Sequence, residues 1–120
     1  MTMGQPVVKW QIISKNPERH ASFYEKLFQW TSTIDNTLGY PMIDTGTEHG
    51  IDGGFWPAPP QANSFVQLFI QVDDVAGSVK LACELGAKVL IPPQKLPDGD
   101  EMAILHDPEG VSFGLVKSIG

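Results

Sequence analysis

Apolar and polar side chains alternate along residues 65–72, which have the sequence Phe-Val-Gln-Leu-Phe-Ile-Gln-Val. A period of two is typical of a β-strand with two different faces. One face of this strand would carry only aliphatic side chains and would need a helix packed against it. The other face combines two phenylalanines with two glutamines. Aromatic rings beside amides suit the wall of a ligand cavity, so we expect the fold to be organised around this strand.

Two segments combine helical spacing with the residues that start helices. Asn16-Pro17 is an N-cap residue followed by a proline at the first helical position, and the predicted helix ends near residues 29–30. Asp74 caps a second predicted helix, which runs to Leu85 and is followed by a capping Gly86. The apolar stripes expected to face a sheet are Ala21, Tyr24, Leu27 and Phe28 in the first helix, and Val75, Val79 and Ala82 in the second.

The remaining apolar segments predict a duplicated fold. Further strands are expected at 7–13, 31–35, 40–45, 51–56, 87–91, 102–105 and 111–116, with Pro92-Pro93 ending the strand at 87–91. The order strand, helix, three strands then occurs twice, and a shift of 58 residues places Lys9 on Gln67. We therefore expect an α+β fold in which two βαβββ modules have curved mixed sheets that enclose a cavity. The single domain would span 1–120, with modules at about 6–57 and 65–118 and a proline-rich linker at 57–64.

Composition narrows the classes of function. A net charge of −6 argues against nucleic acid or an anionic membrane as a partner. No apolar run approaches the roughly 20 residues of a membrane span, and no signal peptide is evident. Cys83 is the single cysteine, so it cannot form an internal disulfide, and we expect it to be a small core residue. These features favour a cytoplasmic protein.

Several motifs together resemble the vicinal oxygen chelate superfamily, which includes glyoxalase I, the bleomycin and fosfomycin resistance proteins and the extradiol dioxygenases. The motifs are Asn16-Pro17 followed by Ala21-Ser22-Phe23-Tyr24, the pair Gly53-Gly54, Val72-Asp73-Asp74-Val75, and Asp107-Pro108-Glu109-Gly110 before the last strand. The resemblance covers nearly the whole chain. It implies a small cytoplasmic protein, commonly a homodimer, with a cavity in each curved sheet.

The resemblance also locates the positions at which related proteins hold a metal ion. Their His, Gln or Glu ligands come from the first and last strands of each module, and the matching positions here are Lys9, Gln67, Gly114 and a residue near Trp56. Lysine repels a cation, glycine has no side chain, and an indole offers only an N–H donor. One neutral amide does not hold a divalent ion against water, so we expect no metal cofactor at this place.

The residues predicted to face the cavity combine amides, aromatic rings and one cation. Lys9 could hold an anionic group, or act as a base if the cavity excludes water. His106 ends a strand beside Asp107 and is the other catalytic candidate, whereas His20 and His49 are expected at the surface or in a turn. The glycines Gly53, Gly54 and Gly114 would leave room for a ligand. The predicted ligand-binding set is Lys9, Gln11, Trp56, Gln67, Phe69, Gln71, Ser112 and Gly114, with Tyr40 as a further candidate.

Three kinds of function fit these residues. The favoured one is a metal-free binding protein of the antibiotic-sequestering kind, whose ligand is a flat or anionic small molecule. The alternative is a glyoxalase-like lyase or isomerase, or a dioxygenase-type enzyme, that is metal-dependent or uses Lys9 or His106. The third is an interaction protein with a closed interior, whose dimer surface is its function. The sequence leaves open whether the modules pair within one chain or across a dimer.

Overall fold

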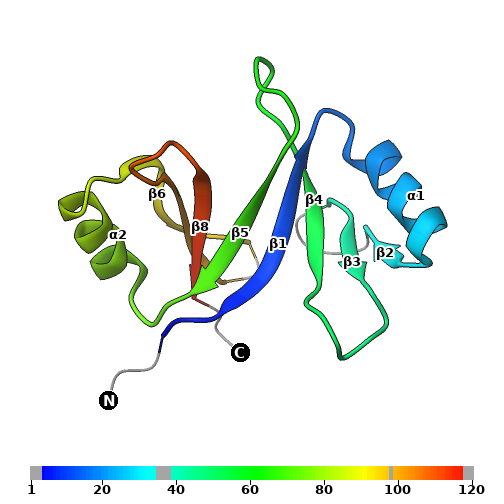
Figure 1. Ribbon diagram of the computed structural model, residues 1–120, viewed down its shortest axis with the longest axis horizontal. Coiled ribbons are helices and arrows are strands. Elements are labelled where there is room, and N and C mark those ends of the chain that lie inside the picture. Colours follow the sequence, from blue (N-terminus) through cyan, green and yellow to red (C-terminus); the bar gives the residue numbers. More distant parts are fainter. Residues whose placement is uncertain (1–3, 35–38, 98, 118–120) are drawn as a thin grey trace. The chain divides into compact units, whose positions relative to one another are not determined.

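A computed structural model describes residues 4–34, 39–97 and 99–117. The chain divides into two compact units, one spanning Lys9–Gln67 and the other combining the residues up to Val8 with those from Leu68 onward. Each βαβββ module contributes one helix, which packs against the strands of its own module (Figure 1). The prediction of an α+β fold with two βαβββ modules is therefore confirmed. The predicted cavity between curved sheets stays a prediction.

The first module has its first and last strands paired in parallel. Its strand order is β2-β3-β4-β1, and the β2–β3 and β3–β4 pairs are antiparallel. A parallel pair needs a long crossover connection, which α1 and the β2–β3 hairpin supply here. The elements are β1 (Val7–Ser14), α1 (Pro17–Phe28), β2 (Thr31–Thr33), β3 (Met42–Asp44) and β4 (Gly53–Pro57). The predicted strand end at residue 35 lies outside the described residues.

The start and end of α1 follow from local chemistry. The Oδ1 atom of Asn16 accepts a hydrogen bond from the backbone N–H of Arg19 at 3.1 Å, and Pro17 occupies the first turn. Gln29 has a φ of 61°, in the left-handed region that ends many helices. The predicted cap and helix end are therefore confirmed.

The core of the first module is smaller than the helical pattern predicts. Ile12, Ala21, Ile43 and Phe55 form its buried cluster, with Trp10, Tyr24 and Trp30 packed around it. Leu27 and Phe28, predicted to face the sheet, are instead 57% and 53% exposed. Because β2 and β3 have only three residues each, the sheet offers little surface to cover the last turn of α1.

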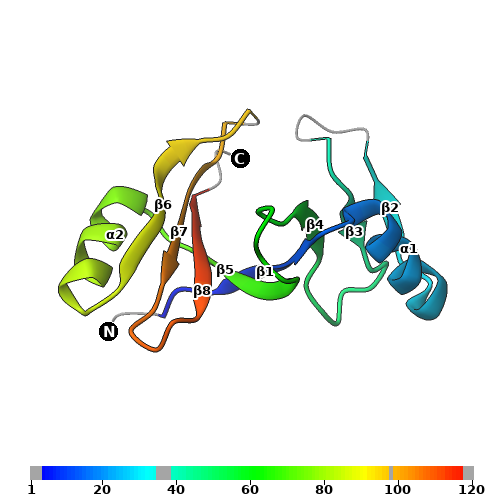
Figure 2. The same ribbon diagram turned by 90° about the horizontal axis from the view of Figure 1, so that it is seen from above.

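The second module repeats this topology, with β6, β7 and β8 beside α2 (Figure 2). Its strand order is β5-β8-β7-β6, with β5 and β8 parallel and the other pairs antiparallel. The elements are β5 (Phe65–Gln71), α2 (Val75–Glu84), β6 (Lys88–Lys95), β7 (Glu101–His106) and β8 (Ser112–Lys117). Neither α1 nor α2, the helices found among the described residues, has the length and apolar character of a membrane span.

The strand β6 corrects the prediction that Pro92-Pro93 ends it. The strand continues through both prolines to Lys95, and its register against β7 shifts between Val89 and Ile91 and again between Ile91 and Gln94. β6 is the last strand in the order of its module, and no strand of the described part of the chain pairs with its outer side. Prolines are tolerated in such an edge strand.

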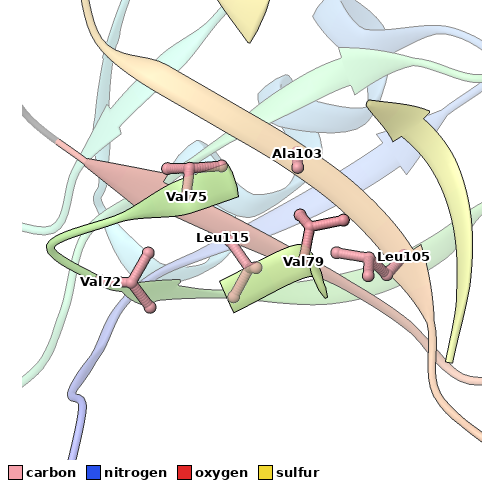
Figure 3. Packing of buried hydrophobic residues seen from close by; sticks show 6 residues of the cluster. All are labelled: Val72, Val75, Val79, Ala103, Leu105 and Leu115. Carbon is pink, nitrogen blue, oxygen red and sulfur yellow. The ribbon is translucent and has the colours of Figure 1, made fainter. Parts of the chain in front are cut away.

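The main core of the second module lies between α2 and its sheet. Val75 and Val79 of α2 point toward Ala103, Leu105 and Leu115 of β7 and β8, and Val72 completes the cluster (Figure 3). The Oδ1 atom of Asp74 accepts a hydrogen bond from the Gly77 N–H at 3.0 Å, as the predicted cap requires. Cys83, expected in the core, is exposed on α2.

The two faces of β5 are not divided as the alternation predicts. Ile70 and Val72 do pack on the helix side, but Val66 and Leu68 on the same aliphatic face are 59% and 46% exposed. The aliphatic face is thus covered by α2 only over the second half of the strand.

Candidate ligand-binding face

The face of β1 and β4 that points away from α1 carries three of the predicted ligand-binding residues, and Gln67 of the neighbouring strand β5 contacts this face. Trp10 and Ile12 pack toward α1, so the alternating Lys9 and Gln11 lie on the opposite face. In the β1–β4 ladder Gln11 is paired with Gly54, and Ile13 with Trp56. We call the set Lys9, Gln11, Gly54, Trp56 and Gln67 the amide face.

The two glutamines of the amide face bind each other. Gln67 is only 5% exposed, and its Nε2 donates a hydrogen bond to the Oε1 of Gln11 at 2.6 Å. Buried amides require hydrogen-bond partners, and this bond fixes the direction of both side chains. Two predicted ligand-binding residues that are 56 positions apart in sequence are therefore brought into contact.

An aromatic pair adjoins the amides along β4. The rings of Trp56 and Tyr40 have centroids 4.6 Å apart and planes inclined by 56°. Both side chains are partly buried, so each keeps some surface that a ligand could cover. Tilted ring pairs of this kind provide a firm apolar wall.

The glycines leave less room than the sequence suggests. A Cβ on Gly53 would lie 2.2 Å from the Cδ2 of Trp10, and one on Gly114 would lie 2.3 Å from the Cε1 of Phe69. A Cβ on Gly54 would meet the Sδ of Met42 at 3.2 Å. The space beside these glycines is therefore filled by side chains of the chain itself, and Phe69 is 2% exposed in a cluster with Ile104 and Val116.

The strand register also corrects the metal-ligand position assigned near Trp56. Phe69 is paired with Gly114, as Gln11 is paired with Gly54. The offset between modules is therefore 58 residues on the first strands (69 − 11) and 60 on the last strands (114 − 54), because the second module has longer connections. The residue equivalent to Gly114 is Gly54.

The corrected positions do not fit the metal ion that the resemblance implies. They hold one ammonium group, one neutral amide and two glycines, namely Lys9, Gln67, Gly54 and Gly114. This donor set offers a single uncharged ligand atom, which is too little for a divalent cation. Elsewhere in ranges 4–34, 39–97 and 99–117, no three His, Cys, Asp or Glu side chains gather as metal ligands would.

The predicted site residues of the second module lie along β5 and β8. Gln71 is exposed, and its backbone N–H donates to the Pro6 carbonyl oxygen at 3.0 Å. Ser112 is partly buried and is paired with His106 at the end of the β7–β8 ladder. The ligand-binding roles of Phe69, Gln71, Ser112 and Gly114, and the catalytic role of His106, stay predictions.

The turn after His106 is the structural motif that its sequence predicts. The Oδ1 atom of Asp107 accepts hydrogen bonds from the N–H groups of Glu109 at 2.9 Å and Val111 at 3.0 Å. The Asp107 carboxylate thus holds the turn between β7 and β8 through hydrogen bonds to the backbone.

The environment of His20 differs from the surface position that the sequence predicts. His20 is partly buried rather than at the surface, and its Nδ1 lies 2.9 Å from the Oγ of Ser14. Its ring centroid is 5.2 Å from that of Phe55 and 5.6 Å from that of Tyr24. The spacing in sequence could have indicated this contact, because His20 lies four positions before Tyr24 and residues at this spacing share one side of a helix. His49 is exposed in a turn, as expected.

The chain belongs to the family of glyoxalase-like domains, whose sequence pattern matches residues 10–116. This match covers most of the chain and agrees with the duplicated βαβββ fold. The resemblance to the vicinal oxygen chelate superfamily is therefore confirmed.

Among curated proteins, the chain is similar to a protein of Mycobacterium tuberculosis and its counterpart in Mycobacterium bovis, which both carry the provisional name glyoxylase CFP32. Each is 24% identical over 110 residues, which is 89% of this chain and 42% of the relative. The chain thus spans less than half the length of these relatives.

Solved structures share the fold at low sequence identity. A variant of the methylmalonyl-CoA epimerase of Streptomyces coelicolor, in complex with 2-nitronate-propionyl-CoA, is 17% identical with a TM-score of 0.63, over 95% of this chain and 97% of that chain. A hypothetical protein of Bacillus halodurans C-125 is 12% identical with a TM-score of 0.72, over 98% and 97% of the two chains. At these identities the likeness shows the fold alone.

Proposed function

We propose that this protein binds a small organic molecule, flat or anionic, on the amide face of its Lys9–Gln67 unit, with no metal ion at the positions used by related enzymes. The observation that carries the proposal is the hydrogen bond between Gln67 and Gln11, beside the ring pair of Trp56 and Tyr40. Amides held in a fixed direction next to an aromatic wall are typical of sites that orient a ligand and cover its apolar part.

The chemistry of the amide face favours a ligand with a carbonyl or carboxylate group. With the Oε1 of Gln11 engaged by Gln67, the N–H₂ end of Gln11 is the part that can donate to a ligand oxygen. Lys9 lies two residues earlier on the same face, which places it roughly 7 Å along the strand. One small anion can therefore reach both groups, while its flat portion contacts Trp56.

The similar proteins favour an enzyme as the second candidate. The epimerase is solved with a coenzyme A ester, and CFP32 is named as a glyoxylase. On that view the chain would be a glyoxalase-like lyase or isomerase, or a dioxygenase-type enzyme, with Lys9 or His106 moving a proton. In either case we propose a cytoplasmic homodimer, as the superfamily resemblance implies.

The test is a thermal-shift screen of the intact chain after treatment with EDTA, using flat aromatic carboxylates, short acyl-coenzyme A esters and bleomycin. We expect at least one compound to raise the melting temperature, and Gln11→Leu to abolish that increase. Gln94→Leu is the matched control, because Gln94 is an exposed glutamine on β6. Protection that persists in Gln11→Leu would contradict the proposal.

A turnover assay separates the two candidates. If the protein is an enzyme, His106→Gln removes product formation from a bound ester while ligand protection remains, whereas Lys9→Met removes product formation and also weakens protection. If it is a binding protein, the bound compound is recovered unchanged from the wild-type chain.

A further inference from the structure

A surface depression of about 310 Å³ lies where β1 ends and α1 begins, away from the amide face. Ser14 forms its buried edge, and Phe23, which is 58% exposed, forms an apolar side. None of the residues of the amide face contributes to it. The lining residues are Ser14, Lys15, Asn16, Arg19, His20, Phe23 and Ser64.

The charge of this depression is opposite to that of the whole protein. The chain has a net charge of −6, yet the lining includes a lysine, an arginine and a histidine and no carboxylate. Across residues 4–34, 39–97 and 99–117, the side chains of Lys15 and Arg19 take part in no ion pair. Glu18, the acidic residue of the first turn of α1, is not among the lining residues. Two neighbouring cations that form no ion pair attract an anion from solvent.

His20 is held in place at this depression by two kinds of contact. Its Nδ1 lies 2.9 Å from the Oγ of Ser14, which is 2% exposed and also accepts the Asn16 N–H at 3.1 Å. The rings of Phe55 and Tyr24 restrain the plane of the imidazole. Since Nδ1 is engaged, Nε2 is the ring nitrogen that can hydrogen-bond to a ligand.

We propose that this depression binds the oxyanion group of a small organic anion, a phosphate or a carboxylate. The Arg19 guanidinium and the Lys15 ammonium would bind the oxyanion, with the Nε2 of His20 as a directed partner. Phe23 would contact the apolar part of the molecule. The site is separate from the proposed ligand-binding face and does not depend on it.

The test is an NMR titration of the intact chain labelled with ¹⁵N, using phenyl phosphate, inorganic phosphate and benzoate in parallel. We expect saturable shifts of the Ser14, Lys15, Arg19 and His20 signals, including the His20 ring nitrogens. Arg19→Gln should raise the dissociation constant about tenfold, the usual loss for one charge-assisted hydrogen bond. Lys26→Gln, which removes a charge from the last turn of the same helix, should change it less than about twofold.

The contact between Phe23 and the organic part of the ligand is tested with Phe23→Ser. This variant should weaken the binding of phenyl phosphate and benzoate and leave the binding of inorganic phosphate unchanged. The tighter of the two aromatic ligands identifies the preferred oxyanion. Equal weakening by Arg19→Gln and Lys26→Gln, or shifts that do not saturate, would overturn the proposal. Gln11→Leu should leave this binding intact, so its outcome is independent of the function proposed for the amide face.

Discussion

Gly114 must be glycine because the ring of Phe69 occupies the space that a side chain would need. The predicted Cβ position lies 2.3 Å from the Cε1 of Phe69, which is 2% exposed and cannot swing into solvent. Gly114→Ala should therefore destabilise the fold by about 1–3 kcal/mol through overpacking. Urea denaturation measures this loss.

Two variants check that prediction. Gly50→Ala is the control, because no atom lies within 4 Å of its Cβ position. Adding Phe69→Leu to Gly114→Ala should recover part of the loss, since a smaller side chain removes the clash. A Gly114→Ala protein as stable as the Gly50→Ala protein would show that the contact is absent.

Ser14 is the other residue whose role is visible only in the structure. It is 2% exposed, and its Oγ accepts the Asn16 N–H and contacts the Nδ1 of His20. Ser14→Ala would leave that N–H without its partner, at a cost of about 1–3 kcal/mol. Thermal unfolding of both variants measures this cost. Ser64→Ala is the control, and it should be nearly neutral because Ser64 is an exposed serine.

At the scale of elements, the ends of helices and turns were predictable from sequence, because single side chains determine them. The caps at Asn16 and Asp74 and the turn at Asp107 all form the local hydrogen bonds expected of them. What covers each element was less predictable. Leu27 is exposed because β2 and β3 are short, which periodicity within the helix cannot reveal.

The prolines of β6 serve a different purpose from the one their sequence suggests. They lie within a strand at the end of the sheet order, whose Val89, Leu90 and Ile91 are 39%, 50% and 38% exposed. An apolar edge strand invites pairing with other chains, and proline, bulges and lysine oppose this. We expect Pro92→Val with Pro93→Thr to increase aggregation on mild heating, measured by light scattering.

The linker proline Pro60 offers a control for this prediction. Pro60→Val removes an exposed proline outside any strand, so it should leave the scattering curve unchanged. Equal aggregation of the two proteins, or none in either, would show that the β6 prolines do not protect the edge.

At the scale of the whole molecule, the duplication was predictable because each module repeats the same order of elements. The 58-residue shift relates Gln11 to Phe69, but it placed the partner of Gly114 two residues too late. Loop lengths change the offset, and only the strand register reveals this. The pairing of Gln67 with Gln11 likewise needed the fold, since these residues are 56 positions apart.

Duplication also gives each module a sheet and a helix of its own. The four positions at which related proteins hold a metal ion lie on the first and last strands of these modules. In this chain those positions hold Lys9, Gln67, Gly54 and Gly114. The ligand-binding role that we propose falls to amides and aromatic rings instead.

The most direct test of the central claim is calorimetric titration of a compound from the thermal-shift screen into EDTA-treated protein. The account predicts that binding survives removal of metal and weakens at least about tenfold in Gln11→Leu, because an oriented hydrogen bond to the ligand is lost. Binding that disappears after EDTA and returns with added nickel or zinc would contradict it.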